Sequence, residues 1–185
     1  MREGEVSAVE VSDLDGVCGS VIAEERLRPL SREELERYHR NALVPQVGLV
    51  GQQRIRASRI LLIGAGGLGA PAALYLAAAG VGTIGLIDDD EVDVSNLQRQ
   101  VIHATAAVGR PKVDSAAEAI RALNPDVEVV AHRRRLTADN ARGLLGGWDV
   151  VIDGTDNFPT RYLVNDATVM LGLPLVHGAV LGFNG

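Results

Sequence analysis

Gly64, Gly66 and Gly69 form a G-x-G-x-x-G turn that joins two apolar segments of the chain. The segment before it, residues 59–63, is short and rich in Ile and Leu, which predicts a buried β-strand. The segment after it, residues 70–79, has Pro71 in its first turn and stops at Gly80, which predicts a buried helix. Glycine permits a positive φ and a close approach of two backbones. A strand–turn–helix unit of this kind requires a sheet that is covered by helices.

The segments that follow repeat the alternation of strand and helix. Strands are predicted over residues 83–88, 127–131, 149–153 and 175–179, and helices over residues 110–123, 137–145 and 159–171. Residues 94–107 are expected to form short helical or irregular pieces. Aromatic residues make up only 3% of the chain, so the core must consist of Val, Ile, Leu and Ala. The predicted fold class is α/β, a Rossmann-like, doubly wound, mainly parallel sheet with N-terminal helices.

The N-terminal region divides into two parts. Ser31 and Glu34 fit an S-x-x-E capping box, which predicts a helix to about residue 43, and a short second helix is expected over residues 51–57. Residues 1–30 lack periodicity and carry seven acids against three arginines, which indicates a flexible acidic extension. Residues 31–185 are expected to form one domain. Because residues 181–185 resemble an interrupted element, that domain is expected to be incomplete at its C-terminus.

Composition excludes several classes of protein. A net charge of −6 argues against a nucleic-acid or anionic-membrane surface. Cys18 is the only cysteine, which rules out an internal disulfide and a zinc site with paired cysteines in this chain. We find no apolar run of about 18 residues and no signal-peptide pattern at the N-terminus, and we therefore expect a cytoplasmic protein.

The glycine turn predicts a phosphate-binding site. The free N–H groups and the dipole at the start of the following helix attract an anion. Asp88 ends the second strand 19 residues after Gly69, where a ribose-binding acid is expected (88 − 69 = 19). The alternative is a glycine turn that serves strand–helix packing alone. The motif does not identify the nucleotide, and by itself it favours NAD.

Three features further along the chain do not fit NAD. Residues 95–100 form a polar stretch from which Asn96 and Arg99 could reach phosphates, or which could simply be solvated. Lys112, the only lysine among 18 basic residues, lies in the first turn of a helix, where a cation opposes the dipole and needs either an anion or water. Asp156 follows the fourth strand and could hold magnesium or cap the next helix, whereas Asp153 is expected to be structural.

Taken together, these motifs resemble the ThiF/MoeB family of adenylyltransferases, which are related to ubiquitin-activating enzymes. The resemblance runs from about residue 30 to residue 185, and residues 161–166 resemble the variant that is fused to a sulfurtransferase domain. The segments that carry it are the glycine turn at residues 64–69, Asp88-x-Asp90, residues 95–100, Gly109-x-Pro111-Lys112 and Asp153-x-x-Asp156-Asn157.

The resemblance implies a role for each matching residue. Gly67 would contact the nucleotide, Asp88 the ribose, and Asn96, Arg99 and Lys112 the triphosphate. Asp156 would hold Mg²⁺, with Asn157 beside it near the adenine. Arg40 matches an arginine that the family inserts into the site of a neighbouring subunit, which implies a homodimer. The full set of residues expected to contact ATP is Gly64, Gly66, Gly67, Gly69, Asp88, Ser95, Asn96, Leu97, Gln98, Arg99, Lys112, Asp156 and Asn157, and those expected to act in catalysis are Arg40, Arg99, Lys112 and Asp156.

The implied reaction is adenylylation of a carboxylate. A ubiquitin-like sulfur-carrier protein of the MoaD or ThiS type would present its C-terminal glycine to ATP, and pyrophosphate would leave. The pathway, whether of molybdopterin or of thiamine type, stays open. His103, His132 and His177 are expected to be structural. Family members carry structural zinc on paired cysteines that this chain lacks. The alternatives are an NAD-linked oxidoreductase, which would leave Arg99, Lys112 and Asp156 unused, and a non-catalytic partner subunit of the same fold.

Overall fold

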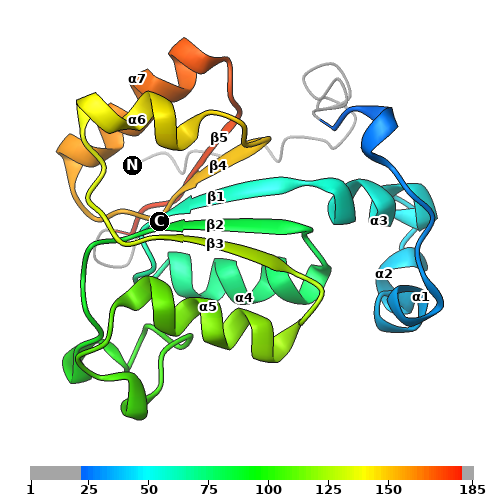
Figure 1. Cartoon of the computed structure of the whole chain (residues 1–185), viewed down its shortest axis with the longest axis horizontal. Coiled ribbons are helices and arrows are strands. Elements are labelled where there is room, and N and C mark those ends of the chain that lie inside the picture. Colours follow the sequence, from blue (N-terminus) through cyan, green and yellow to red (C-terminus); the bar gives the residue numbers. More distant parts are fainter. Residues whose placement is uncertain (1–21, 181–185) are drawn as a thin grey trace, which may run out of the picture.

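A five-stranded parallel sheet forms the centre of the protein, seen here in a computed structural model that describes residues 22–180 (Figure 1). Its strands are β1 (Arg59–Ile63), β2 (Thr83–Ile87), β3 (Glu128–His132), β4 (Val150–Asp153) and β5 (Leu175–His177). They are ordered β3-β2-β1-β4-β5, and every neighbouring pair is parallel. The strand order reverses beside β1, as in doubly wound sheets. The predicted fold class is confirmed, with strand ends that shift by one or two residues.

Helices cover both faces of this sheet (Figure 1). Helices α4 (Gly69–Ala79) and α5 (Lys112–Leu123) lie on one face, and α6 (Ala138–Leu145) and α7 (Phe158–Leu171) lie on the other. Alternate residues of a strand point to opposite faces, so Leu62 packs with α4 and α5 while Leu61 and Ile63 pack with α6 and α7. Alanines along one side of α4 are fully buried, which allows the helix to lie close to the sheet.

Three short helices precede the sheet: α1 (Arg32–Arg37), α2 (His39–Ala42) and α3 (Gly48–Ala57). The capping box of Ser31 and Glu34 is confirmed, but the single helix expected to residue 43 is wrong. The chain breaks at Tyr38, which adopts φ −101° and ψ 11°. The break directs the Tyr38 ring into the interior, where it is 2% exposed and packs on Gly80, and Asn124 donates a 2.8 Å hydrogen bond to its hydroxyl.

The described residues include nine that precede Ser31, the expected start of the domain. Ile22 is buried, and residues 24–26 form a short 3₁₀ helix, η2 (Glu24–Arg26). Arg26 pairs with Asp149 at 2.6 Å, and Asp149 also accepts a 2.7 Å bond from the backbone N–H of Arg59. This ion pair attaches residues 22–30 to the amino ends of β1 and β4. Cys18 and the rest of the predicted extension lie outside the described residues.

The segment between β2 and α5 is irregular, as predicted for residues 94–107. It contains two 3₁₀ turns, η3 (Val94–Asn96) and η4 (Thr105–Ala107). An antiparallel bridge between Glu91 and Pro111 closes it into a loop, and Pro111 caps α5, which therefore starts two residues later than expected. Among residues 22–180, no helix has the length and apolar character that crossing a membrane requires.

Candidate functional site

A cavity of about 630 Å³ opens at the carboxyl ends of the strands, the edge where open α/β sheets bind ligands. Its walls come from the glycine turn, from the ends of β1, β2 and β4, from the irregular segment and from the first turn of α7. The residues that line it are Ile63, Gly64, Gly66, Gly67, Leu68, Ile87, Asp88, Asp89, Asp90, Asn96, Arg99, Gln100, Lys112, Arg134, Arg135, Leu136, Gly154, Thr155, Asp156, Asn157, Thr160, Arg161 and Val180.

The glycine turn forms the floor of this cavity. Gly64 has a φ of +90°, and its N–H donates a 2.9 Å bond to the carbonyl of Ile87. A Cβ on Gly69 would collide with the carbonyl of Gly64, so Gly69 is needed for packing the turn on α4, and it does not line the cavity. Gly66 and Gly67 do line it, beside the N-terminus of an 11-residue helix. Such an N-terminus offers unpaired N–H groups to an anion.

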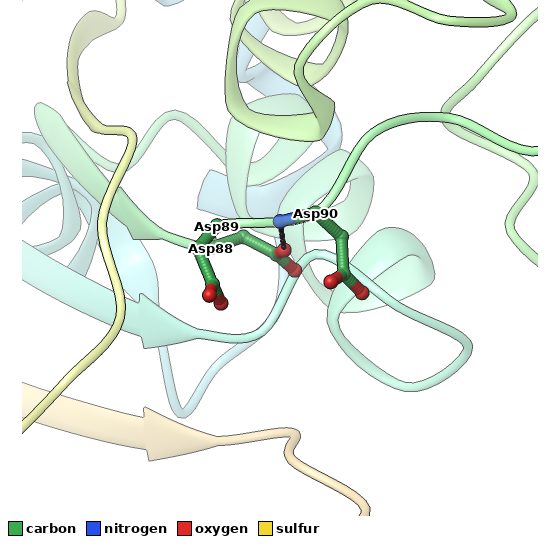
Figure 2. Close-up of side chains that lie close together, drawn as sticks. All are labelled: Asp88, Asp89 and Asp90. Atoms are coloured by element: carbon green, nitrogen blue, oxygen red, sulfur yellow. Dashed lines mark hydrogen bonds between the residues drawn. The ribbon is translucent and has the colours of Figure 1, made fainter.

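Asp88 connects the end of β2 to the glycine turn. Its Oδ2 accepts a 2.8 Å bond from the N–H of Ala65, and its Oδ1 accepts a 2.8 Å bond from the N–H of Asp90. Figure 2 shows this second bond and the adjoining side chains of Asp89 and Asp90. Burial raises the pKa of Asp88, and the two N–H donors counteract that effect. The carboxylate is fixed in place at the cavity wall, where a ribose is expected.

Lys112 is buried and ion-paired. The residue is 6% exposed, its Nζ lies 2.7 Å from Oδ2 of Asp90, and its backbone N–H donates a 2.9 Å bond to the Asp90 carbonyl. Exposure to water, one of the two alternatives for this helix-opening cation, is therefore wrong. In the structure the required anion is Asp90, and the ammonium also lines the cavity. It can serve a second anion there.

The irregular segment contributes a polar wall. Gln100 is 3% exposed and donates a 2.7 Å bond to the side-chain oxygen of Asn96, which fixes both amides. The side chain of Arg99 passes over the glycine turn, so close that a Cβ atom added to Gly67 would lie 3.4 Å from Arg99 Cδ. Arg99 therefore holds its guanidinium beside Gly67, two residues before α4 begins. Together with Lys112 it gives this end of the cavity two cations for phosphate oxygens.

The loop after β4 forms the opposite wall. Asn157, and not Asp156, is the N-cap of α7, with its Oδ1 accepting a 3.0 Å bond from the N–H of Thr160. Arg161 donates bonds of 3.1 and 2.8 Å to the carbonyl of Thr155, which fixes the loop. Asp153 is buried, as expected for a structural acid: it accepts bonds from Thr155 and lies 2.9 Å from His177 Nδ1.

The hydrogen bonds in the cavity favour Asp156 over the three acids that follow β2 as a magnesium ligand. Asp88, Asp89 and Asp90 place one oxygen each within 4.8 Å of one another (Figure 2). However, both Asp88 oxygens already accept backbone N–H groups, and Asp90 pairs with Lys112. Asp156 is exposed to the cavity, and within residues 22–180 no group donates a hydrogen bond to its carboxylate. Its free, hard oxygens fit a magnesium ion that retains waters and phosphate ligands.

The structure gathers most of the predicted residues but not all of them. Gly64, Gly66, Gly67, Asp88, Asn96, Arg99, Lys112, Asp156 and Asn157 line one cavity, whereas Gly69, Ser95, Leu97 and Gln98 do not. Arg40 lies on α2, at the amino ends of the strands and so at the opposite end of the sheet from the cavity (Figure 1). It is exposed and makes no contact with the site of its own chain.

Sequence reasoning missed three arginines of the cavity, Arg134, Arg135 and Arg161. Arg134 and Arg135 follow β3 directly, so the rule that ligands bind beyond the carboxyl ends of strands would have found them. Arg161 lies one helical turn after the Asn157 cap and carried no comparable signal. Leu136, with Ile63 and Ile87, gives the cavity an apolar part that suits a flat base.

Comparisons with known proteins agree with this geometry. Residues 38–185 match the model of the ThiF family. The chain is 57% identical over 156 residues to the probable adenylyltransferase/sulfurtransferase MoeZ of Mycobacterium tuberculosis (strain CDC 1551 / Oshkosh), covering 84% of this chain and 40% of that one. It is 53% identical to the sulfur carrier protein adenylyltransferase of Thermus thermophilus, covering 84% of this chain and 57% of the relative. The chain thus spans about half the length, or less, of these curated relatives.

Solved structures show the same fold with nucleotide bound. The tRNA N6-threonylcarbamoyladenosine dehydratase TcdA of E. coli in complex with ATP has a TM-score of 0.76 and 32% identity, covering 80% of this chain and 60% of that one. A complex of the same enzyme with AMP gives the same score and identity. The family match covers most of the chain and includes the glycine turn, the irregular segment and the loop after β4. The chain belongs to the ThiF family.

Proposed function

We propose that this chain is the nucleotide-binding part of an adenylyltransferase that activates the C-terminal glycine of a ubiquitin-like sulfur-carrier protein. The observation that carries the proposal is the convergence of Arg99, Lys112 and Asp156 around the glycine turn in one cavity. An NAD-linked oxidoreductase would leave these three groups without a role, and the relatives do not favour it. A non-catalytic subunit would have no need to retain them.

In the proposed reaction, a carboxylate oxygen of the carrier attacks the α-phosphorus of ATP. The new acyl–phosphate bond forms as the bond between the α-phosphorus and the bridging oxygen breaks, and pyrophosphate leaves. Arg99 and Lys112 would bind the phosphates and neutralise the charge that builds on them, while Asp88 would hold the ribose. Asp156 would hold Mg²⁺, which supplies further neutralisation of the phosphates. The protein contributes alignment and charge, and needs no general base.

The proposal extends to partners and location. Arg40 would enter the site of a second copy, since its own cavity is at the far end of the sheet (Figure 1). The carrier would be of the MoaD or ThiS type, serving molybdopterin or thiamine synthesis, and the reaction would take place in the cytoplasm, where ATP is present. Zinc would be bound only by a longer relative with paired cysteines.

Pyrophosphate exchange into ATP, dependent on a carrier that ends in glycine, tests the function. The parent chain should catalyse exchange, and Asp156→Asn should reduce it by about 100-fold or more, the scale on which removal of one transition-state contact acts. Asp166→Asn, an exposed acid on α7, is the matched control and should exchange normally. Exchange at the parent rate in Asp156→Asn would contradict the proposal.

A further inference from the structure

His103 is a buried imidazole that the proposed reaction does not use. It lies in the irregular segment between β2 and α5, is 7% exposed, and does not line the cavity. Its two ring nitrogens nevertheless both have partners. Nδ1 lies 3.0 Å from the hydroxyl of Ser115 on α5, and Nε2 lies 3.2 Å from the carbonyl of Ala65 in the glycine turn.

The partners determine the proton positions. A backbone carbonyl can only accept, so Nε2 must carry the proton and donate it to Ala65. In the neutral ring Nδ1 is then an acceptor, and the Ser115 hydroxyl donates to it. Burial lowers the pKa of His103 and Lys112 acts in the same direction; together they outweigh the bond to Ala65 and the charge of Asp88, which both raise the pKa. The neutral ring is the form that this site holds near pH 7.

The Ala65 residue is therefore held on both sides. Its N–H donates to Asp88 at the end of β2, and its carbonyl accepts from His103. The next two residues are Gly66 and Gly67, which line the cavity and which, as glycines, have little conformational restriction of their own. A free glycine turn would lose much of its backbone freedom on binding phosphate, and a turn that is already fixed would not.

We infer that His103 is a positioning residue of the nucleotide site: as the Nε2–H tautomer, supported by the Ser115 hydroxyl, it fixes the Ala65 carbonyl and so presents Gly66 and Gly67 to phosphate. The inference deepens the proposed function, because the phosphate it concerns is that of the same nucleotide. It acts before any reaction with a carrier. Its tests therefore need no carrier and remain informative if the exchange assay fails.

A matched set of variants separates positioning from packing. In His103→Gln the side-chain amide nitrogen reaches the place of Nε2 and can still donate to Ala65. In His103→Asn the amide reaches only the place of Nδ1, beside Ser115, and in His103→Leu both bonds are lost. With ATP–Mg titrated calorimetrically into the full chain, we expect His103→Gln to bind within about threefold of the parent, and His103→Asn and His103→Leu to bind about tenfold more weakly.

Two further measurements keep the inference testable if a variant fails to fold. In the unsubstituted chain, two-bond ¹H–¹⁵N correlations of the imidazole should show the neutral Nε2–H tautomer at pH 7. Amide hydrogen exchange at Ala65, whose N–H donates to Asp88, should be faster in Ser115→Ala than in the parent when measured without nucleotide, while exchange in β1 is unchanged. An Nδ1–H tautomer, or equal ATP affinity in His103→Gln and His103→Leu, would overturn the inference.

Discussion

The ammonium of Lys112 lies 2.7 Å from a carboxylate oxygen of Asp90, and it joins the first turn of α5 to the end of β2. The Lys112 side chain is 7% exposed, while that of Asp90 is 67% exposed. Lys112 lies at the positive end of the α5 dipole, which is unfavourable for a cation, and the negative charge of Asp90 compensates for this. The same ammonium lines the cavity, so a phosphate can share it with Asp90.

Replacement of Lys112 by arginine should weaken ATP binding although the charge is kept. The side chain is enclosed, and a planar guanidinium needs more room and a different bonding geometry than a compact ammonium. We expect Lys112→Arg to raise the Kd for ATP–Mg about tenfold or more, as loss of a charge-assisted hydrogen bond would. Arg121→Lys, an exposed exchange on the same helix, is the control for the calorimetric titration. Parent affinity in Lys112→Arg would show that the ammonium does not contact the nucleotide.

Substitution of Gly69 should disturb the turn without removing any group from the cavity. A Cβ there meets the backbone carbonyl of Gly64, which cannot move without moving β1. Gly69→Ala is expected to cost about 1–3 kcal/mol of unfolding free energy, in the range for overpacking. Gly143→Ala, in α6 with open space around the new methyl group, should instead stabilise by about 0.5–1 kcal/mol. Urea unfolding of both variants checks the contrast, and equal effects would contradict it.

Glu34 should contribute stability that depends on pH. Burial alone would raise its pKa, but bonds from Arg28, the Ser31 N–H and Arg56 outweigh burial and lower the pKa from its ordinary value of 4.5 to about 2. Because the folded pKa lies below the unfolded one, the contribution is complete above pH 4.5 and disappears as the pH falls toward 2. At 1.36 kcal/mol per pKa unit it amounts to at most about 3 kcal/mol at pH 7.

Glu34→Gln measures this contribution. The variant should unfold at lower urea concentration than the parent at pH 7, and the difference should shrink steadily between pH 4.5 and pH 2.5. Glu36→Gln, an exposed carboxylate on the same helix, provides the control and should change little. A difference that is constant over this pH range would mean that Glu34 acts through packing and not through its charge.

Arg40→Ala should abolish pyrophosphate exchange in a homogeneous preparation and regain part of it in a mixture. If Arg40 serves a neighbouring site, a mixed dimer of Arg40→Ala with Asp156→Asn contains one site with an intact arginine and an intact acid. We expect the mixture to recover up to about one quarter of parent activity, since random pairing gives half mixed dimers with one working site each. Arg37→Ala, exposed on α1, is the control. Failure of every mixing ratio to restore exchange would exclude action across subunits.

The sheet was predictable because its signals are local. Five apolar runs, the first four of which are each followed by a helix before the next run, specify parallel strands, and the glycine turn specifies which strand ends carry the ligand. The break at Tyr38 was not predictable, because no local signal interrupts the helix there. It arises from tertiary contacts with Gly80 and Asn124, which are more than 40 residues away in the chain.

The cavity was predictable where a residue follows a strand end or a recognisable motif, as Asp88, Asn96 and Asp156 do. It was not predictable where a side chain acts through a distant partner. The pairing of Lys112 with Asp90 depends on the closed loop between Glu91 and Pro111. The contact of His103 with the Ala65 carbonyl likewise requires the irregular segment to fold back under the glycine turn, and periodicity carries no information about that path.

The placement of α2 at the amino ends of the strands has a consequence for kinetics. A chain that keeps Arg40 so far from its own cavity cannot assemble a complete site alone, if that arginine takes part in the reaction. Activity per molecule would then depend on the fraction of chains that are in the dimer. On dilution below the dissociation constant of the dimer, specific activity would fall with concentration, whereas the affinity of each separate chain for ATP would fall much less.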